Sequence, residues 1–179
     1  FKIERLWQTA IEDEENPGLY TLQPLDMILH SAAHLFHEGE FDNGLRDLVD
    51  LDALLREYVI PFAIWEKLLE RAHKLDLSIY LYHTLILCEH ILKTPVSDQI
   101  LHDITRQNKV GPLYKALFKW IFTLALLPNH SSCIPRGSGF ARSLLLIRSH
   151  WIRMPLKILI PHLLKKSLSR KKNLSHQHK

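Results

Sequence analysis

Residues 24–37 read Pro-Leu-Asp-Met-Ile-Leu-His-Ser-Ala-Ala-His-Leu-Phe-His. Pro24 suits the first turn of a helix, where its missing N–H costs nothing. The apolar residues recur at the i, i+3, i+4, i+7 spacing of one helix face: Leu25, Ile28, Leu29, Ala32, Ala33 and Phe36. The adjoining face carries a second stripe of Asp26, His30, His34 and His37. This segment therefore predicts an amphipathic helix that packs into a core and presents histidines beside it.

The next segment, residues 43–58, predicts a second helix close to those histidines. Its apolar positions are Leu45, Leu48, Leu51, Leu54 and Leu55. Arg46 and Asp50 cluster with Glu57 on the opposite face. Asp52 falls within the apolar arc, so we expect it either to lie at an exposed end of the helix or to have a partner.

Helical spacing continues through the rest of the chain, and no convincing alternating strand interrupts it. We expect further helices at 2–13, 62–75, 78–92, from Ser97, 113–127, 140–154 and 156–168. The predicted fold class is all-α, an irregular bundle of about eight helices. The expected domains are a helical unit at 1–168 and a basic disordered tail at 169–179. We expect core positions for all four tryptophans, Trp7, Trp65, Trp120 and Trp151.

Composition favours one packed domain in the cytoplasm. The chain has 179 residues, 46% of them hydrophobic, and only 6 Gly. Two cysteines without metal-type spacing, Cys88 and Cys133, predict free thiols in a reducing compartment. No segment has the roughly 18 uninterrupted apolar residues of a membrane span. The chain begins at Phe1 without a secretory leader, so we expect a piece of a longer polypeptide or a processed form.

The net charge of +4 conceals two oppositely charged parts. Residues 1–103 hold all 19 acidic side chains and 8 Lys/Arg, a formal charge of −11. Residues 104–179 hold the other 15 Lys/Arg and no acidic side chain, a formal charge of +15. The simplest expectation is that the two parts pack together and leave a positive surplus at the C-terminal end. An anionic surface or nucleic acid is the alternative partner for the basic part.

The two histidines at i, i+4, His30 and His34, have the spacing that can place two imidazoles on one metal. A hydrolytic zinc helix needs Glu directly after the first His, and Ser31 stands there instead. A His-Asp phosphohydrolase requires an Asp directly after a histidine, and of the 12 histidines only His102 has one, far in the sequence from His30 and His34. The alternatives are partly buried histidines bonded to Asp47, Asp50 or backbone, and histidines that face a ligand.

The acidic and basic residues of 43–58 also allow two interpretations. Arg46, Asp47 and Asp50 could clamp a substrate, with Arg46 binding phosphate bidentately. Alternatively, Arg46 and Asp50 form an ordinary i, i+4 pair on the helix surface. For the basic, apolar segment 142–166 we favour plain helix packing with solvated basic residues, and an anionic membrane surface or nucleic acid is the alternative. The sequence contains no Gly-rich phosphate loop and no Ser-His-Asp or Cys-His order.

Several of these motifs, taken in order, resemble one family. They are Leu22-Gln-Pro-Leu-Asp-Met-Ile-Leu-His30 with His34, Leu45-Arg-Asp-Leu-Val-Asp-Leu51, Ile64-Trp65, Pro95-Val96 and Ile147-Arg-Ser-His-Trp-Ile-Arg-Met-Pro155. Together they span most of residues 20–166. The chain resembles the uncharacterised bacterial nucleotidyltransferase-like proteins of the polymerase-β type superfamily.

The resemblance implies a protein in two parts. An N-terminal α/β catalytic core with a Gly-Ser turn and an Asp-x-Asp pair holds Mg²⁺ and the nucleoside triphosphate, and a helical region follows. Neither motif occurs here on a strand, and Asp50-Leu-Asp52 lies in a predicted helix, where its carboxylates diverge by about 200°. The chain thus resembles the C-terminal helical region without its catalytic core. The resemblance places His30, His34 and Asp50 at the seam with that core, and we add Arg46 as the fourth expected substrate-binding residue.

Three hypotheses follow. The first is the helical part of a nucleotidyltransferase, inactive alone, which acts on a nucleoside triphosphate and an unknown acceptor in the intact protein. The second is a non-enzymatic interaction module whose basic C-terminal half binds an anionic partner. The third is a metal-dependent hydrolase that uses His30, His34, His37 and Asp50.

Overall fold

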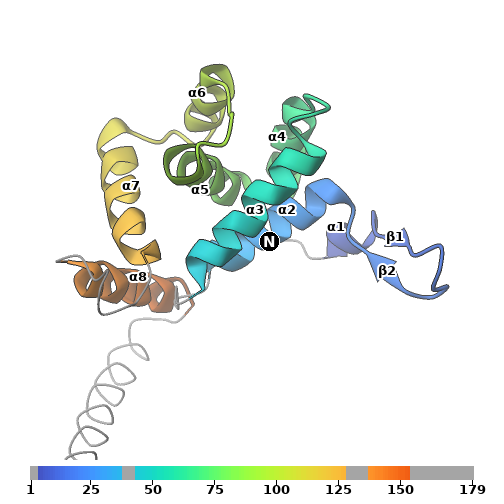
Figure 1. The fold of residues 1–179 in the computed structure, drawn as a ribbon, viewed down its shortest axis with the longest axis horizontal. Coiled ribbons are helices and arrows are strands. Elements are labelled where there is room, and N and C mark those ends of the chain that lie inside the picture. The colour runs from blue at the N-terminus through green and yellow to red at the C-terminus, as the bar shows by residue number, and fades with distance from the viewer. Residues whose placement is uncertain (1–3, 38–42, 128–136, 154–179) are drawn as a thin grey trace, which may run out of the picture.

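The computed structural model describes residues 4–37, 43–127 and 137–153. Within these ranges it contains eight α-helices, a π-helix and one small hairpin (Figure 1). The α-helices are α1 (Glu4–Trp7), α2 (Pro24–His37), α3 (Gly44–Tyr58), α4 (Trp65–Lys74), α5 (Ser78–Leu87), α6 (Asp98–Gln107), α7 (Pro112–Leu126) and α8 (Ser138–Arg153). The predicted all-α bundle of about eight helices is confirmed. The expected helix at 156–168 and the tail at 169–179 lie outside the described residues. No helix in the described ranges is long and apolar enough to cross a membrane.

Helix α5 is the centre of the bundle. It is apolar on nearly every side, a composition typical of a helix enclosed by others, and it packs against α2, α4, α6 and α7. All residues from Leu81 to Leu87 are buried. The helix continues as the π-helix η1 (Cys88–Leu92), so that α5 and η1 together cover the predicted helix at 78–92. The thiol of Cys88 is free, as expected, and it is buried, whereas Cys133 lies outside the described residues.

The polar residues that end η1 connect it to α3. Lys93 takes a left-handed conformation, with φ of 55°. The hydroxyl of the buried Thr94 then donates to Asp52 Oδ1 at 2.6 Å. Arg56 donates to both oxygens of the same carboxylate, at 3.0 and 2.9 Å. Asp52 therefore has partners, which confirms one of the two expectations for it.

The expected first helix at 2–13 is wrong beyond Trp7. Strands β1 (Ile11–Glu12) and β2 (Tyr20–Thr21) form a short antiparallel hairpin instead. The Asp13 carboxylate accepts from the backbone N–H groups of Glu15 and Asn16, at 2.9 and 2.8 Å. Such local bonds compete with helix formation, because they satisfy backbone donors that the helix would use. Gly18, with φ of 92°, completes the turn.

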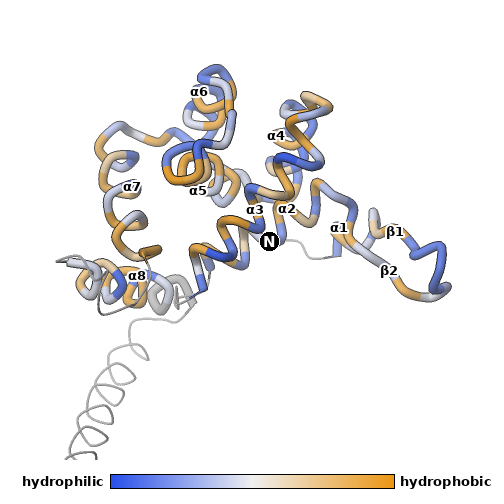
Figure 2. The backbone as a smooth tube through the Cα atoms, in the orientation of Figure 1, coloured by the Kyte–Doolittle hydropathy of each residue, from blue (hydrophilic) through white to orange (hydrophobic). Residues whose placement is uncertain are grey.

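Two of the four tryptophans that we expected in the core are exposed. Trp7 is 64% exposed and Trp120 is 55% exposed, so the prediction of core positions is wrong for both. Trp65 is half-buried and packs against the core, as predicted. The side chain of Trp151 lies outside the described part. Helix α7 is hydrophobic along most of its length (Figure 2), so periodicity alone could not tell which of its sides is covered.

A buried ion pair joins the N-terminal segment to α2 and α4. Asp26 has no exposed surface, and it accepts from Arg71 Nε at 2.7 Å and from Arg71 Nη2 at 2.8 Å. Thr9 Oγ1 and Gln23 Nε2 also donate to this carboxylate, at 2.7 and 2.9 Å. Arg71 Nη2 donates in addition to the carbonyl of Arg5 at 3.1 Å. The spacing of α2 predicted one stripe for Asp26 and the three histidines. Asp26 is buried, however, whereas the histidines are exposed.

Replacing Asp26 by Asn should reduce the free energy of unfolding by about 3 kcal/mol, because the substitution leaves the Arg71 guanidinium without its counter-charge. Urea unfolding monitored by circular dichroism measures the change. The matched control is Glu70→Gln, which breaks the exposed Glu70–Lys74 pair of 2.6 Å on α4 and should have little effect. Equal losses in the two variants would contradict a special role for Asp26.

Candidate functional site

The four predicted substrate-binding residues lie on the exposed surfaces of α2 and α3. His30 and His34 are both exposed and stand one turn apart on α2. Arg46 and Asp50 are both exposed and stand one turn apart on α3. The two helices pack directly against each other. The alternative that His30 and His34 are partly buried is therefore wrong, because the apolar face of α2 turns toward the core and leaves both imidazoles outside.

Of the two interpretations of Arg46 and Asp50, the ordinary surface pair is not formed. No ion pair in the described ranges joins these two residues, although their spacing would allow one. The i, i+4 pair on α3 lies further along, where Arg56 Nε is 2.9 Å from Asp52 Oδ2. The Arg46 guanidinium, exposed on the surface, is therefore available for an anionic ligand.

The carboxylates of Asp50 and Asp52 do not share a site. Asp50 is exposed, whereas Asp52 is half-buried and bonded to Thr94 and Arg56. Catalysis by two Mg²⁺ ions needs closely spaced carboxylates whose oxygens are free to coordinate. The described residues do not fit such a centre.

A metal site built from histidines is also not assembled. In the described part of the chain, no group of three or more His, Cys, Asp or Glu side chains could hold a metal ion. His30, His34, His37 and Asp50 therefore do not converge as the hydrolase hypothesis requires. The ring Nδ1 of His37 lies 3.5 Å from the hydroxyl of Tyr80 instead.

Sequence reasoning missed a second histidine environment, at His83 in α5. This side chain is 1% exposed, and its Nε2 lies 2.9 Å from the Tyr114 hydroxyl. Its ring stacks on Phe118, with centroids 4.2 Å apart, and meets Phe36 edge-on at 5.2 Å. Within the described residues its Nδ1 has no hydrogen-bond partner. The available signal was that α5 is apolar on all sides, so any polar residue in it must be enclosed.

Burial keeps this imidazole neutral. Desolvation, assisted by the positive charge of Arg148, lowers the pKa of His83 from 6.5 to about 3. Arg148 is itself held in α8, where its Nη1 donates to the carbonyl of Phe36 at 3.2 Å. Aromatic contacts of this cluster join α2, α5 and α7, and the hydrogen bond from Arg148 attaches α8 to it. The buried His83 therefore does not serve as an exposed acid or base.

The comparison with known protein families gives a match to the N-terminal half of the chain. The sequence model of an uncharacterised nucleotidyltransferase family matches residues 1–93, which carry α1 to α5, the hairpin and η1. The match covers just over half of the chain and includes both helices of the candidate site. No curated protein and no solved structure matches. The chain therefore belongs to this family of uncharacterised nucleotidyltransferases.

The neutral His83 makes stability dependent on pH. The unfolded chain takes up a proton at this residue below pH 6.5, whereas the folded protein resists protonation down to about pH 3. Stability should therefore fall as the pH drops from 6.5 toward 3. In this window the unfolded chain binds up to about one proton more than the folded protein, and this difference sets the slope of the unfolding free energy against pH. The variant His83→Phe should remove it. Unfolding free energies measured at several pH values in this window provide the test, with exposed His30→Phe as the control, and an unchanged slope in His83→Phe would contradict the assignment.

Proposed function

We propose that this chain is the helical C-terminal part of a nucleotidyltransferase and that α2 and α3 present its substrate-binding face. The family match over residues 1–93 is the observation that carries the proposal, because it includes the two helices that hold His30, His34, Arg46 and Asp50. The ordered motifs of the sequence support the same assignment. In this proposal an α/β core that precedes the helical part supplies the catalytic carboxylates.

The side chains of α2 and α3 are suited to binding substrate and not to the transfer step. An exposed Arg can bind a phosphate through two parallel N–H donors, and a neighbouring imidazole can donate or accept a further bond. Arg46 on α3 and His30 on α2 offer these groups from two helices that pack together. Binding and orientation are thus the proposed tasks of this region, whereas Mg²⁺ and the transfer step belong to the core.

The chain alone should release no pyrophosphate. Incubation of the 179-residue protein with Mg-ATP or Mg-CTP, followed by a pyrophosphate assay, tests this expectation directly. The coding sequence upstream of Phe1 should encode a Gly-Ser turn and an Asp-x-Asp pair on a strand. Pyrophosphate release by the isolated chain, or an upstream sequence without these motifs, would overturn the proposal.

In the protein that includes this upstream segment, Arg46→Ala should raise the KM for the phosphate-bearing substrate roughly tenfold, which corresponds to the loss of about 1.4 kcal/mol of binding. The matched control is Arg56→Ala, since Arg56 lies on the same helix but bonds to Asp52. Initial rates over a range of nucleotide concentrations measure both effects. If the two variants had the same KM, the phosphate would not be bound by Arg46.

A further inference from the structure

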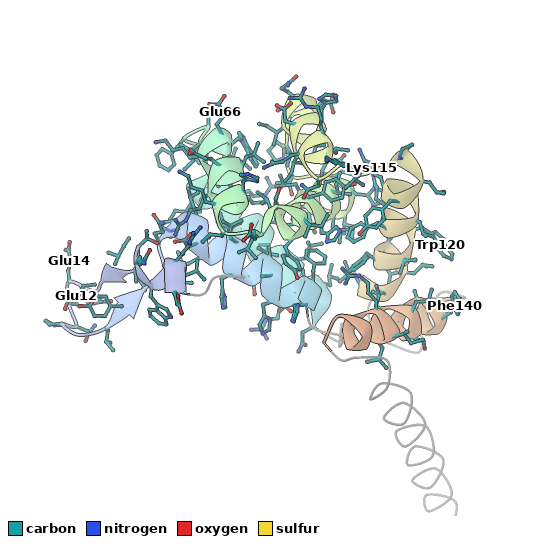
Figure 3. The ribbon with its side chains drawn as sticks, turned by 180° about the vertical axis from the view of Figure 1, so that it is seen from behind. Glu12, Glu14, Glu66, Lys115, Trp120 and Phe140 are labelled. Carbon is teal, nitrogen blue, oxygen red and sulfur yellow. The ribbon has the colours of Figure 1, made fainter. Side chains whose placement is uncertain are left out.

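Helices α7 and α8 form a pair at one end of the molecule. They pack against each other, and α7 also packs against α5. Trp120 of α7 and Phe140 of α8 project from this end, opposite the hairpin (Figure 3). Lys119 Nζ of α7 lies 3.9 Å from Glu89 Oε2 of η1, a contact of the kind expected between the basic and acidic parts of the chain. We call the two helices the α7–α8 pair.

An aromatic cluster attaches the α7–α8 pair to the bundle. Phe118 and Phe122 of α7 are buried, and their ring centroids lie 6.1 and 5.5 Å from that of Phe36 on α2. His83 of α5 lies among these rings. Its centroid is 4.2 Å from that of Phe118, 5.2 Å from that of Phe36 and 6.5 Å from that of Phe122. Three apolar rings thus surround an imidazole at the point where α7 is attached.

The other groups that face His83 come from α5, α7 and α8. The hydroxyl of Tyr114 on α7 lies 2.9 Å from Nε2, and the ring of Tyr82 on α5 lies 5.6 Å from the imidazole. Burial raises the pKa of Tyr82 to about 12 and raises that of Tyr114 as well, so both hydroxyls stay neutral in acid. Arg148 of α8 acts on His83 with a positive charge, and its Nη1 donates to the carbonyl of Phe36 at 3.2 Å.

A proton added to this imidazole would oppose the attachment of α7. In the described part of the chain Nδ1 has no hydrogen-bond partner, so the imidazolium would contain a buried, unpaired N–H. Its charge would be enclosed by apolar rings and would face the like charge of Arg148. Separation of the α7–α8 pair from α5 would allow water to solvate the charged ring. The neutral ring therefore favours attachment, and the charged ring favours separation.

We propose that protonation of His83 releases the α7–α8 pair from the bundle while α2 to α5 remain folded. The remaining helices keep contacts of their own, because α2 packs against α3, α4 and α5, and the pair of Asp26 and Arg71 joins α2 to α4. Release breaks the contact of Tyr114 with His83 and the hydrogen bond from Arg148. None of the residues proposed to bind substrate takes part, so this inference and the proposed function fail independently.

The sign and size of the pH effect follow from the two states of His83. The pKa of His83 is about 3 while α7 is attached, and in the released form the solvated ring returns to its ordinary value of 6.5. The equilibrium constant for release should therefore rise as the pH falls below 6.5. Between about pH 6 and pH 4 the expected rise is roughly 70-fold, because only the released form takes up the proton in this range.

Amide hydrogen exchange of the full chain, read by mass spectrometry of peptides and corrected for the intrinsic effect of pH on exchange, tests the proposal. At about pH 6 the amides of α7 and α8 should be less protected than those of α3 and α4, and their protection should fall roughly 70-fold by pH 4. His83→Phe keeps an aromatic ring but takes up no proton, so most of this fall should disappear. The matched control is His102→Phe, at an exposed histidine of α6, which should retain the fall.

A second variant, Tyr114→Phe, separates attachment from protonation. It removes the hydroxyl that pairs with Nε2 of His83, so the protection of α7 and α8 should fall at every pH while its pH dependence stays. Equal loss of protection in α3, α4, α7 and α8 of the unchanged protein would overturn the proposal, because the bundle would then open as one unit. This outcome does not depend on whether a variant folds. An unchanged pH dependence in His83→Phe would also overturn it.

Discussion

Asp26 is a carboxylate without exposed surface, and its burial organises one half of the molecule. Burial opposes its ionised form, but hydrogen bonds from Arg71, Thr9 and Gln23 outweigh this effect, and the pKa of Asp26 falls below its ordinary value. The ion pair with Arg71 forms around a carboxylate that has no exposed surface, so without Arg71 the Asp26 carboxylate would be a buried, uncompensated charge. Because Arg71 also bonds to the backbone of Arg5, the pair holds the N-terminal segment, α2 and α4 together.

The position of α2 has consequences on both of its sides. Its apolar side contributes Ile28, Leu29, Ala32 and Phe36 to the core. Phe36 meets His83 of α5 through its ring and Arg148 of α8 through its carbonyl. On the other side, the same orientation of α2 leaves His30 and His34 exposed. The core packing of α2 and the exposed site proposed on it are thus two sides of one helix.

The surface proposed for substrate is polar. Helices α2 and α3 offer imidazole and guanidinium groups, which suit phosphate. These groups are exposed because the apolar sides of the same helices are used in the core.

The sequence by itself determined the helical class, the limits of α2 and α3, and the family. It also determined the N-cap at Ser97, whose Oγ accepts from the backbone N–H of Ile100 at 3.4 Å. These features depend on spacing within short segments, where 3.6-residue periodicity and capping act locally. Tertiary structure alone decided that Asp26 is buried while His30 is exposed, that His83 is enclosed, and that Trp120 faces outward. Each depends on which neighbouring helix covers a given side, because contacts between residues distant in sequence have no local signature in the chain.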